Sequence, residues 1–196
     1  MKKILQVFLG AMFAAVLSTA VYADSYVVDT GHSSINFAVT HMMVSQVKGG
    51  FTDYLGNLKY DPADLSKTEV DVTIQTASVN TGLEQRDNHL RSADFFDAEK
   101  NPKITFKSVL AKADESGIIT VVGDLTLHGV TQRISVPVKI SGPVKTPMGG
   151  EVIGVSGDLV VNRSEFGVAW NKDMENGGVV VSNEVKVTVN FEAKKQ

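Results

Sequence analysis

The sequence predicts an all-β fold of about eight antiparallel strands, because apolar and polar side chains alternate along most of the chain. The longest run, from Val179 to Phe191, has valines at alternate positions opposite serine, glutamate, lysine and threonine. Similar runs cover residues 34–41, 69–76, 103–110 and 132–140. Such alternation is typical of antiparallel strands with one dry and one wet face. Long strands of this kind form a closed barrel or a two-sheet sandwich, and periodicity does not distinguish them.

Turn and glycine positions support the same fold class. Segments such as Asn176-Gly177-Gly178 separate the runs and suit hairpin loops. Other glycines stand inside strand patterns, where they often mark bulges or the sharp bends of a closing sheet. These are Gly50, Gly56, Gly123, Gly154 and Gly157.

One segment, Asn80 to Phe96, interrupts the β pattern and predicts a short helix with Asn80 or Thr81 as its cap. We expect it to cover one barrel end, and a second irregular stretch spans 162–174. The polar side chains of the helical segment 80–96 have two interpretations: an acid–base or anion-binding site, or ion pairs that fix the helix to the barrel. The ion-pair interpretation joins Arg86 and Arg91 to Asp87, Asp94 or Asp97, and the site interpretation uses Asp87, His89, Arg91 and Asp94.

The first 23 residues predict a cleaved signal peptide. Lys2 and Lys3 precede an uncharged, mostly apolar stretch, and Val21 and Ala23 suit a cleavage site after residue 23. The alternative, a transmembrane anchor, needs roughly 20 apolar residues, more than this stretch supplies. We therefore expect an exported protein whose residues 24–196 form one domain.

Composition excludes several kinds of function. The formal charge of −3 argues against nucleic acid, which favours a basic surface. Without cysteine, the chain has no disulfide, thiol nucleophile or thiolate metal site. The four histidines lack metal-ligand spacing, and no nucleophile-elbow motif is present. We expect no enzyme activity, metal or cofactor, with His41 at a barrel rim satisfied by hydrogen bonds and His128 solvated in a turn.

Four stretches of the chain resemble the YceI-like family. The first has His32, Phe37 and His41 and is followed by Gly50-Phe51 and Gly56. The others are Arg86-x-x-His89-Leu90-Arg91-Ser92-x-Asp94-Phe95-Phe96, Asn101-Pro102-x-Ile104-x-Phe106-x-Ser108 and Gly123-x-Leu125-x-Leu127-His128-Gly129-Val130-Thr131. They occur in the family's order and span most of the chain, whereas residues 145–174 are only loosely similar.

This resemblance implies an extended lipocalin-like, eight-stranded antiparallel barrel with one or two short helices. It also implies a tunnel for an isoprenoid lipid, such as a quinone tail or a polyprenyl chain, and a periplasmic protein that is often a homodimer, in a family not known for catalytic activity. The side chains expected to line the apolar tunnel are Phe37, Val39, His41, Phe51, Val72, Ile74, Leu90, Phe95, Phe96, Phe106, Leu125, Val136, Val185 and Val187.

The residues alone leave alternatives open, because a small barrel can be filled by its own side chains or can hold a ligand. One alternative is a filled barrel that acts as a stress-related interaction module, and another is an enzyme acting on a lipid through His41 and the 87–94 cluster. An outer-membrane barrel is disfavoured by charged residues on the outer strand phase. Two further hypotheses are that Val72→Trp blocks lipid uptake and that Met42, Met43, Met148 and Met174 lie near the tunnel mouth.

Overall fold

The computed structural model describes residues 23–175 and 177–196. The predicted signal peptide, apart from Ala23, lies outside the described residues. The strands are β1 Asp24–Val28, β2 Ser34–His41, β3 Ser45–Phe51, β4 Tyr54–Tyr60, β5 Glu69–Gln75, β6 Val79–Asn80, β7 Lys103–Ala113, β8 Ile119–Leu127, β9 Val130–Lys145, β10 Glu151–Asn162 and β11 Val181–Lys195. The helical segments are α1 Glu84–Arg91 and the 3₁₀ turns η1 Thr30–His32, η2 Leu65–Lys67, η3 Thr76–Ser78 and η4 Arg163–Phe166.

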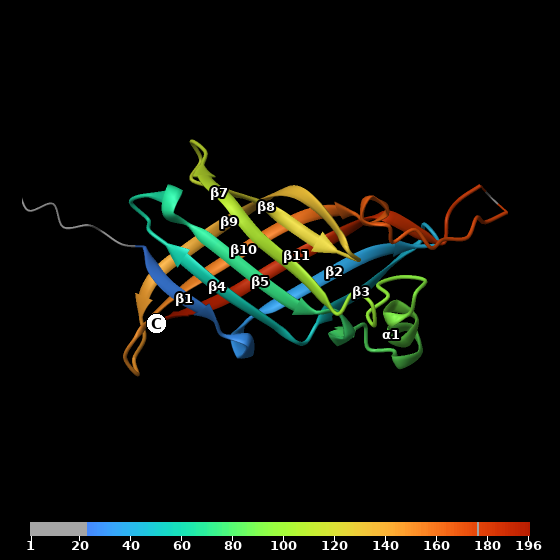
Figure 1. Ribbon diagram of the computed structural model, residues 1–196, viewed down its shortest axis with the longest axis horizontal. Coiled ribbons are helices and arrows are strands. Elements are labelled where there is room, and N and C mark those ends of the chain that lie inside the picture. The colour runs from blue at the N-terminus through green and yellow to red at the C-terminus, as the bar shows by residue number, and fades with distance from the viewer. Residues whose placement is uncertain (1–22, 176) are drawn as a thin grey trace, which may run out of the picture.

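The sheet closes on itself, which confirms the predicted eight-stranded antiparallel barrel (Figure 1). β1 and β2 lie end to end along β11, since Val28 pairs with Ala193 and Ser34 pairs with Asn190. β3 with β4, and β5 with β6, are likewise interrupted halves of one strand path. These three paths, together with β7 to β11, make the eight strands of the described chain. Closure leaves few free strand edges to pair with other chains.

The two ends of the barrel differ. At the end near the C-terminus, which we call the floor, inward side chains pack into a buried cluster that includes Tyr26, Leu58, Ile153 and Phe191. At the other end, which we call the mouth, α1 and the segment from η4 to β11 lie beside the strand ends (Figure 1). Strand alternation therefore directs one continuous apolar face inward, but the protein's own side chains pack it densely only at the floor.

Glycine is required inside β8 where an aromatic ring crosses the strand. A Cβ on Gly123 would lie 2.5 Å from Cζ of Phe106 and 2.6 Å from the Lys107 carbonyl oxygen. The β7–β8 register shifts beside it, between Ser108 and Leu110, as a β-bulge does. A second shift, between Val152 and Gly154 on β10, also confirms the expectation of irregularities near interior glycines.

The α1 helix begins later than the sequence suggested. Its N-cap is Leu83, which makes no side-chain capping bond, so the expected cap at Asn80 or Thr81 is wrong. Both side chains instead stabilise the turn before the helix: Asn80 Oδ1 accepts from Gly82 N at 2.8 Å, and Thr81 Oγ1 donates to Asp87 at 2.6 Å. Among the described residues, no helix is long and apolar enough to span a membrane.

We predict that Gly123→Ala lowers the free energy of unfolding by about 1–3 kcal/mol, because overpacking displaces the Phe106 ring or the β7 backbone. The matched control is Gly154→Ala, whose Cβ would meet only Ser141 Cβ at 3.8 Å. It should change stability by less than about 1 kcal/mol. Urea denaturation of both variants measures this difference, and equal losses would contradict the packing argument.

Candidate ligand-binding cavity

An apolar cavity of about 400 Å³ runs along the inside of the barrel. This volume lies within the range of about 300–1,000 Å³ typical of small-molecule sites. Its lining extends from Tyr60 and Thr68 near the floor to His41 and Trp170 at the mouth. On β11 alone it spans Val181 to Phe191, which at about 3.3 Å per residue is roughly 33 Å of strand. The cavity is therefore long and narrow, a shape that suits a chain better than a compact ring.

All fourteen side chains expected to line the tunnel do line this cavity. Alternation explains the result for strands, since every second residue of β2, β5, β7, β9 and β11 points inward. Phe37, Val136 and Val187 are inward-facing yet only half-buried, because they border open space instead of other side chains. Val72 differs, since it is buried in the packed cluster that continues to the floor. That these residues contact a ligand stays a prediction.

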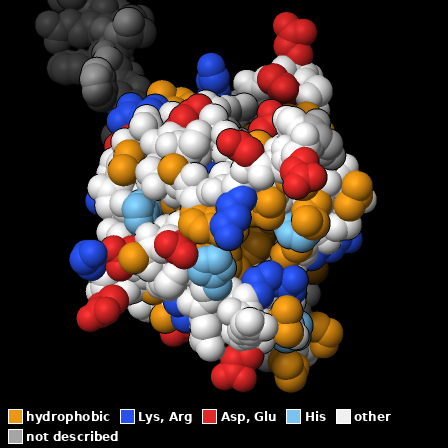
Figure 2. Space-filling model, turned by 90° about the vertical axis from the view of Figure 1, so that its right-hand side faces the viewer, with side chains coloured by type: hydrophobic (Ala, Val, Ile, Leu, Met, Phe, Trp, Pro, Cys, Tyr) orange, Lys and Arg blue, Asp and Glu red, His pale blue; other side chains and the backbone are white. Residues whose placement is uncertain are grey.

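The mouth is partly covered by aromatic contacts between α1 and the segment that follows η4. The His89 and Trp170 rings lie edge to face with centroids 5.2 Å apart, and Phe95 lies about 5 Å from both. Figure 2 looks onto this end and shows apolar side chains deep in a hollow, with basic and histidine side chains on its rim. These contacts hold α1 against the loop while leaving the hollow accessible from outside.

Backbone-directed hydrogen bonds hold α1 in this position. Arg91 donates from Nε to the Ala77 carbonyl at 2.7 Å and from Nη2 to the Val79 carbonyl at 2.9 Å. Arg86 donates to Oγ1 and to the carbonyl oxygen of Thr81. The expectation that these arginines pair with aspartates is therefore wrong. The acceptors are instead carbonyl oxygens of η3, of β6 and of the turn after β6.

The 3₁₀ turn η4 places a second arginine on the cavity wall. Asn162 caps the turn by accepting from Ser164 N, and Gly167 ends it with a φ of 76°. Arg163 is thereby directed inward and is only 6% exposed. It donates to the carbonyl oxygens of Ser182 at 2.9 Å, Val168 at 2.7 Å and Val181 at 3.2 Å. Burial lowers the pKa of this guanidinium below its usual value.

The histidines depart from the sequence expectations. His41 lines the cavity at the mouth, as predicted, but its ring makes no hydrogen bond to any described residue, so the expected satisfied rim histidine is wrong. His128 is not a free turn residue either, because Nδ1 lies 3.2 Å from the Phe166 carbonyl oxygen and the residue is half-buried. It has a left-handed φ of 52° and packs beneath η4.

The methionine hypothesis holds only in part, since Met42, Met43 and Met174 lie in segments at the mouth and Met148 does not. None of Met42, Met43, Met148 or Met174 lines the cavity. Met148 is 97% exposed in the β9–β10 turn, at the opposite end of the barrel from the mouth. Met42 and Met43 form the β2–β3 turn at the mouth, but both face solvent. The placement of these methionines depends on where each turn lies in the folded barrel, and the periodicity of the sequence does not reveal that.

Sequence reasoning missed cavity residues on β10 and beyond it. Val155, Leu159 and Val161 line the cavity from β10, and Arg163, Val168 and Trp170 line it from the segment that follows. The β10 residues carry a readable signal, because 153, 155, 159 and 161 alternate across Gly157. Arg163 carries none, since an isolated arginine after a strand gives no indication that it turns inward.

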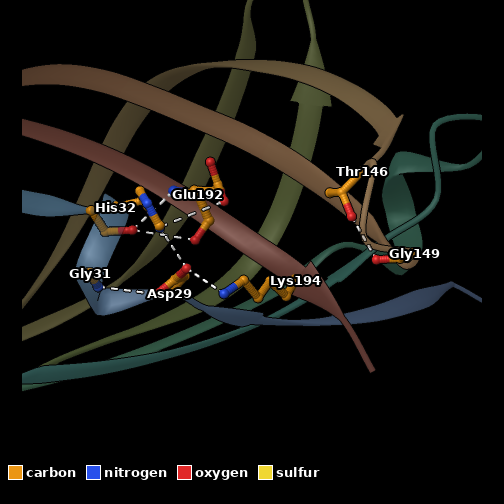
Figure 3. Close-up of polar contacts among 8 residues, drawn as sticks. Asp29, Gly31, His32, Thr146, Gly149, Glu192 and Lys194 are labelled. Atoms are coloured by element: carbon orange, nitrogen blue, oxygen red, sulfur yellow. Dashed lines mark hydrogen bonds and ion pairs between the residues drawn. The ribbon is translucent and has the colours of Figure 1, made fainter.

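Polar groups also gather where η1 separates β1 from β2 (Figure 3). The Asp29 carboxylate lies 2.8 Å from His32 Nδ1 and 2.6 Å from Lys194 Nζ, and His32 Nδ1 lies 4.0 Å from Glu192. Asp29, His32 and Glu192 could each offer a metal ligand. Lys194 already supplies positive charge at Asp29, and its hydrogen bond lowers the pKa of that carboxyl well below its usual range. The cluster joins the interrupted strand to β11.

Comparisons with known proteins agree with this architecture. The model of the YceI-like domain matches residues 26–193. The chain belongs to the YceI-like family. A UPF0312 protein of Staphylococcus aureus strain USA300 is 39% identical over 173 residues, which cover 88% of this chain and 96% of that protein.

Two solved structures are also similar to this chain. A Campylobacter jejuni YCEI protein has a TM-score of 0.69 and 34% identity over 80% of this chain and 90% of its own. Burkholderia cenocepacia BcnA has a TM-score of 0.74 and 25% identity, over 84% of this chain and 98% of its own. The extended barrel is thus shared among relatives whose sequences have diverged widely.

One buried hydroxyl near the floor gives a test of the cavity lining. Thr68 Oγ1 has no hydrogen-bond partner among the described residues, although the side chain is buried and lines the cavity. We predict that Thr68→Val raises the free energy of unfolding of the ligand-free protein by about 1 kcal/mol, because a buried unpaired hydroxyl is costly. Thr126→Val is the control, since its hydroxyl bonds Thr131 at 2.8 Å and should not gain stability. Urea denaturation measures both, and a loss at Thr68 would contradict the argument.

The polar cluster around Asp29, at the junction between β1 and β2, predicts a pH dependence of stability. The hydrogen bond to Asp29 raises the pKa of His32 above 6.5, its ordinary value. A group whose pKa is higher in the folded state than in the unfolded state contributes its full stabilisation at pH values below the unfolded-state pKa. This contribution is lost as the pH rises through the folded-state pKa. The melting temperature of the wild type should therefore exceed that of His32→Asn most below about pH 6.5. A difference that stays constant to pH 9 would show that His32 does not titrate as described.

Proposed function

We propose that this protein binds a long isoprenoid lipid inside the barrel and carries it through the periplasm. The observation that supports this most directly is the apolar cavity along the barrel. Its lining includes side chains that are only half-buried, because neighbouring side chains do not cover them. A domain from Saccharophagus degradans with the same fold, at a TM-score of 0.67 and 18% identity over 89% of this chain and 99% of its own, is described as polyisoprenoid-binding. The export signal that the sequence predicts for residues 1–23 supports the periplasmic location.

The free energies of binding and burial favour a ligand with a long apolar chain over one with a short chain. Micromolar binding requires about −8 kcal/mol. Association itself costs about 4–15 kcal/mol, and each buried methylene contributes about 0.8 kcal/mol. The ligand must therefore bury about 15 to 30 methylene-sized groups, or about three to six isoprene units. A barrel with strands of 9 to 16 residues from β7 to β11 offers the length that this requires.

The structure also corrects the choice of a blocking substitution. Val72→Trp would overpack a buried cluster, so loss of lipid would be confounded by loss of folding. Val187 on β11 is better placed, because it borders the cavity and is half-buried. Its side chain points inward beside Phe37 and Leu159.

We predict that Val187→Trp lowers the amount of co-purified lipid by about tenfold or more, because the indole fills space that the chain would occupy. Val160→Trp is the matched control, since Val160 lies on the neighbouring strand, faces outward and is exposed. Native mass spectrometry of protein purified from its host periplasm without detergent measures the lipid, and circular dichroism checks folding. A wild type without any bound apolar mass, or a folded Val187→Trp that keeps its lipid, would contradict the proposal.

A further inference from the structure

We propose that the polar cluster around Asp29 is a binding site for a divalent transition-metal ion such as zinc. Its ligands are the carboxylates of Asp29 and Glu192 and the imidazole of His32 (Figure 3). None of the three side chains lines the cavity, so this site is separate from the proposed lipid site. The inference therefore adds a second kind of ligand to the protein.

The chemistry of the ligand atoms selects the class of ion. One imidazole nitrogen and two carboxylate oxygens suit zinc, which takes nitrogen and oxygen ligands and can keep a fourth position for water. Magnesium and calcium prefer sites built from oxygen alone. Within the described residues, these side chains are the one group of three whose metal-ligating atoms all lie within 4.8 Å of one another.

The distances between the ligand atoms fit such an ion. Nδ1 of His32 lies 2.8 Å from Oδ2 of Asp29 and 4.0 Å from Oε1 of Glu192. Two ligands of a tetrahedral zinc ion, each about 2.0–2.2 Å from the metal, lie about 3.3–3.6 Å apart. The observed distances lie on either side of this range. Small rotations of the exposed His32 and Glu192 side chains can therefore bring all three atoms onto one ion.

Backbone hydrogen bonds hold the three ligands together. His32 N donates to the carbonyl oxygen of Asp29 at 3.1 Å, and Asp29 N donates to the carbonyl oxygen of Glu192 at 2.8 Å. Gly31 N donates to Oδ1 of Asp29 at 3.1 Å, which leaves Oδ2 for a metal. Groups that orient the ligands in this way raise metal affinity. Histidine spacing could not reveal this site, because Glu192 comes from the opposite end of the chain.

A cation already lies where the metal would bind. Lys194 Nζ is 2.6 Å from Oδ2 of Asp29, the oxygen that a metal would use. The Lys194 side chain is 60% exposed, so its ammonium can move into solvent at little cost. The Glu192 carboxylate, by contrast, accepts no hydrogen bond from any described residue. A metal ion would displace the ammonium and join the two carboxylates.

A metal ion here would reinforce the closure of the barrel. Asp29 and His32 lie between β1 and β2, whereas Glu192 lies on β11, which pairs with both strands. An ion that binds the folded state and not the unfolded chain stabilises the fold. We therefore expect zinc to raise the melting temperature of the wild type.

The test is a calorimetric titration of the protein with zinc chloride, after EDTA and the metal it removes have been dialysed away. We expect one zinc ion to bind per chain, and magnesium chloride to give no binding at the same concentrations. His32→Ala and Glu192→Gln should each weaken zinc binding about tenfold or more. Both side chains lie at the surface, and circular dichroism checks that the variants fold.

Lys194 provides a result that a chance surface site would not give. Lys194→Met should tighten zinc binding about two- to fivefold, because it removes the ammonium that competes for Asp29. Lys195→Met is the matched control, since Lys195 also lies on β11 but pairs with Asp24, at 2.6 Å. Its zinc affinity should equal that of the wild type.

Each of three results would overturn the metal site. These are a wild type without saturable zinc binding, wild-type affinity in a folded His32→Ala or Glu192→Gln, and unchanged affinity in Lys194→Met. None of them would affect the proposed lipid binding, because the three ligands lie outside the cavity.

Discussion

The structure depends on β11, whose backbone closes the barrel by pairing along its length with β10 on one side and with β1 and β2 on the other. Without this closure, the inward apolar faces of the strands would border solvent. The polar cluster around Asp29 reinforces the same seam where β1 gives way to β2. A closed barrel of eight strands also fixes the size of the interior, which is just wide enough for side chains or one narrow ligand.

One part of the interior is filled by side chains and another part is hollow, and this separation explains the proposed function. Tyr26, Tyr54 and Leu58 fill the floor, so the fold has a core that stabilises it without any ligand. Toward the mouth, smaller side chains such as Val185 and Val187 leave space that their neighbours do not fill. Stability and binding are thus assigned to different ends of one barrel. A chain can enter the open end while the packed end stays intact.

Two arginines near the mouth, Arg91 and Arg163, have different roles in this largely apolar structure. Arg91 binds carbonyl oxygens of η3 and β6 and fixes α1, whereas Arg163 binds carbonyl oxygens of Val168 and of the start of β11 and lies on the cavity wall. Both arginines follow strands or turns, and nothing in their immediate sequence distinguishes their roles. The difference arises because Arg91 lies on the side of α1 that faces η3 and β6, whereas Arg86 of α1 and Arg163 of η4 line the cavity.

The sequence by itself determined the all-β class, the antiparallel arrangement and the inward phase of each strand, because alternation at period two specifies which side chains share a face. Residues such as Phe37 and Val136 could be assigned to the interior on that basis. Only the tertiary structure decided whether the interior was hollow, where the methionines lay and how Arg163 faced the cavity. Those properties depend on how strands are spaced around a closed barrel and how loops return over its end, and no local pattern in the chain encodes either.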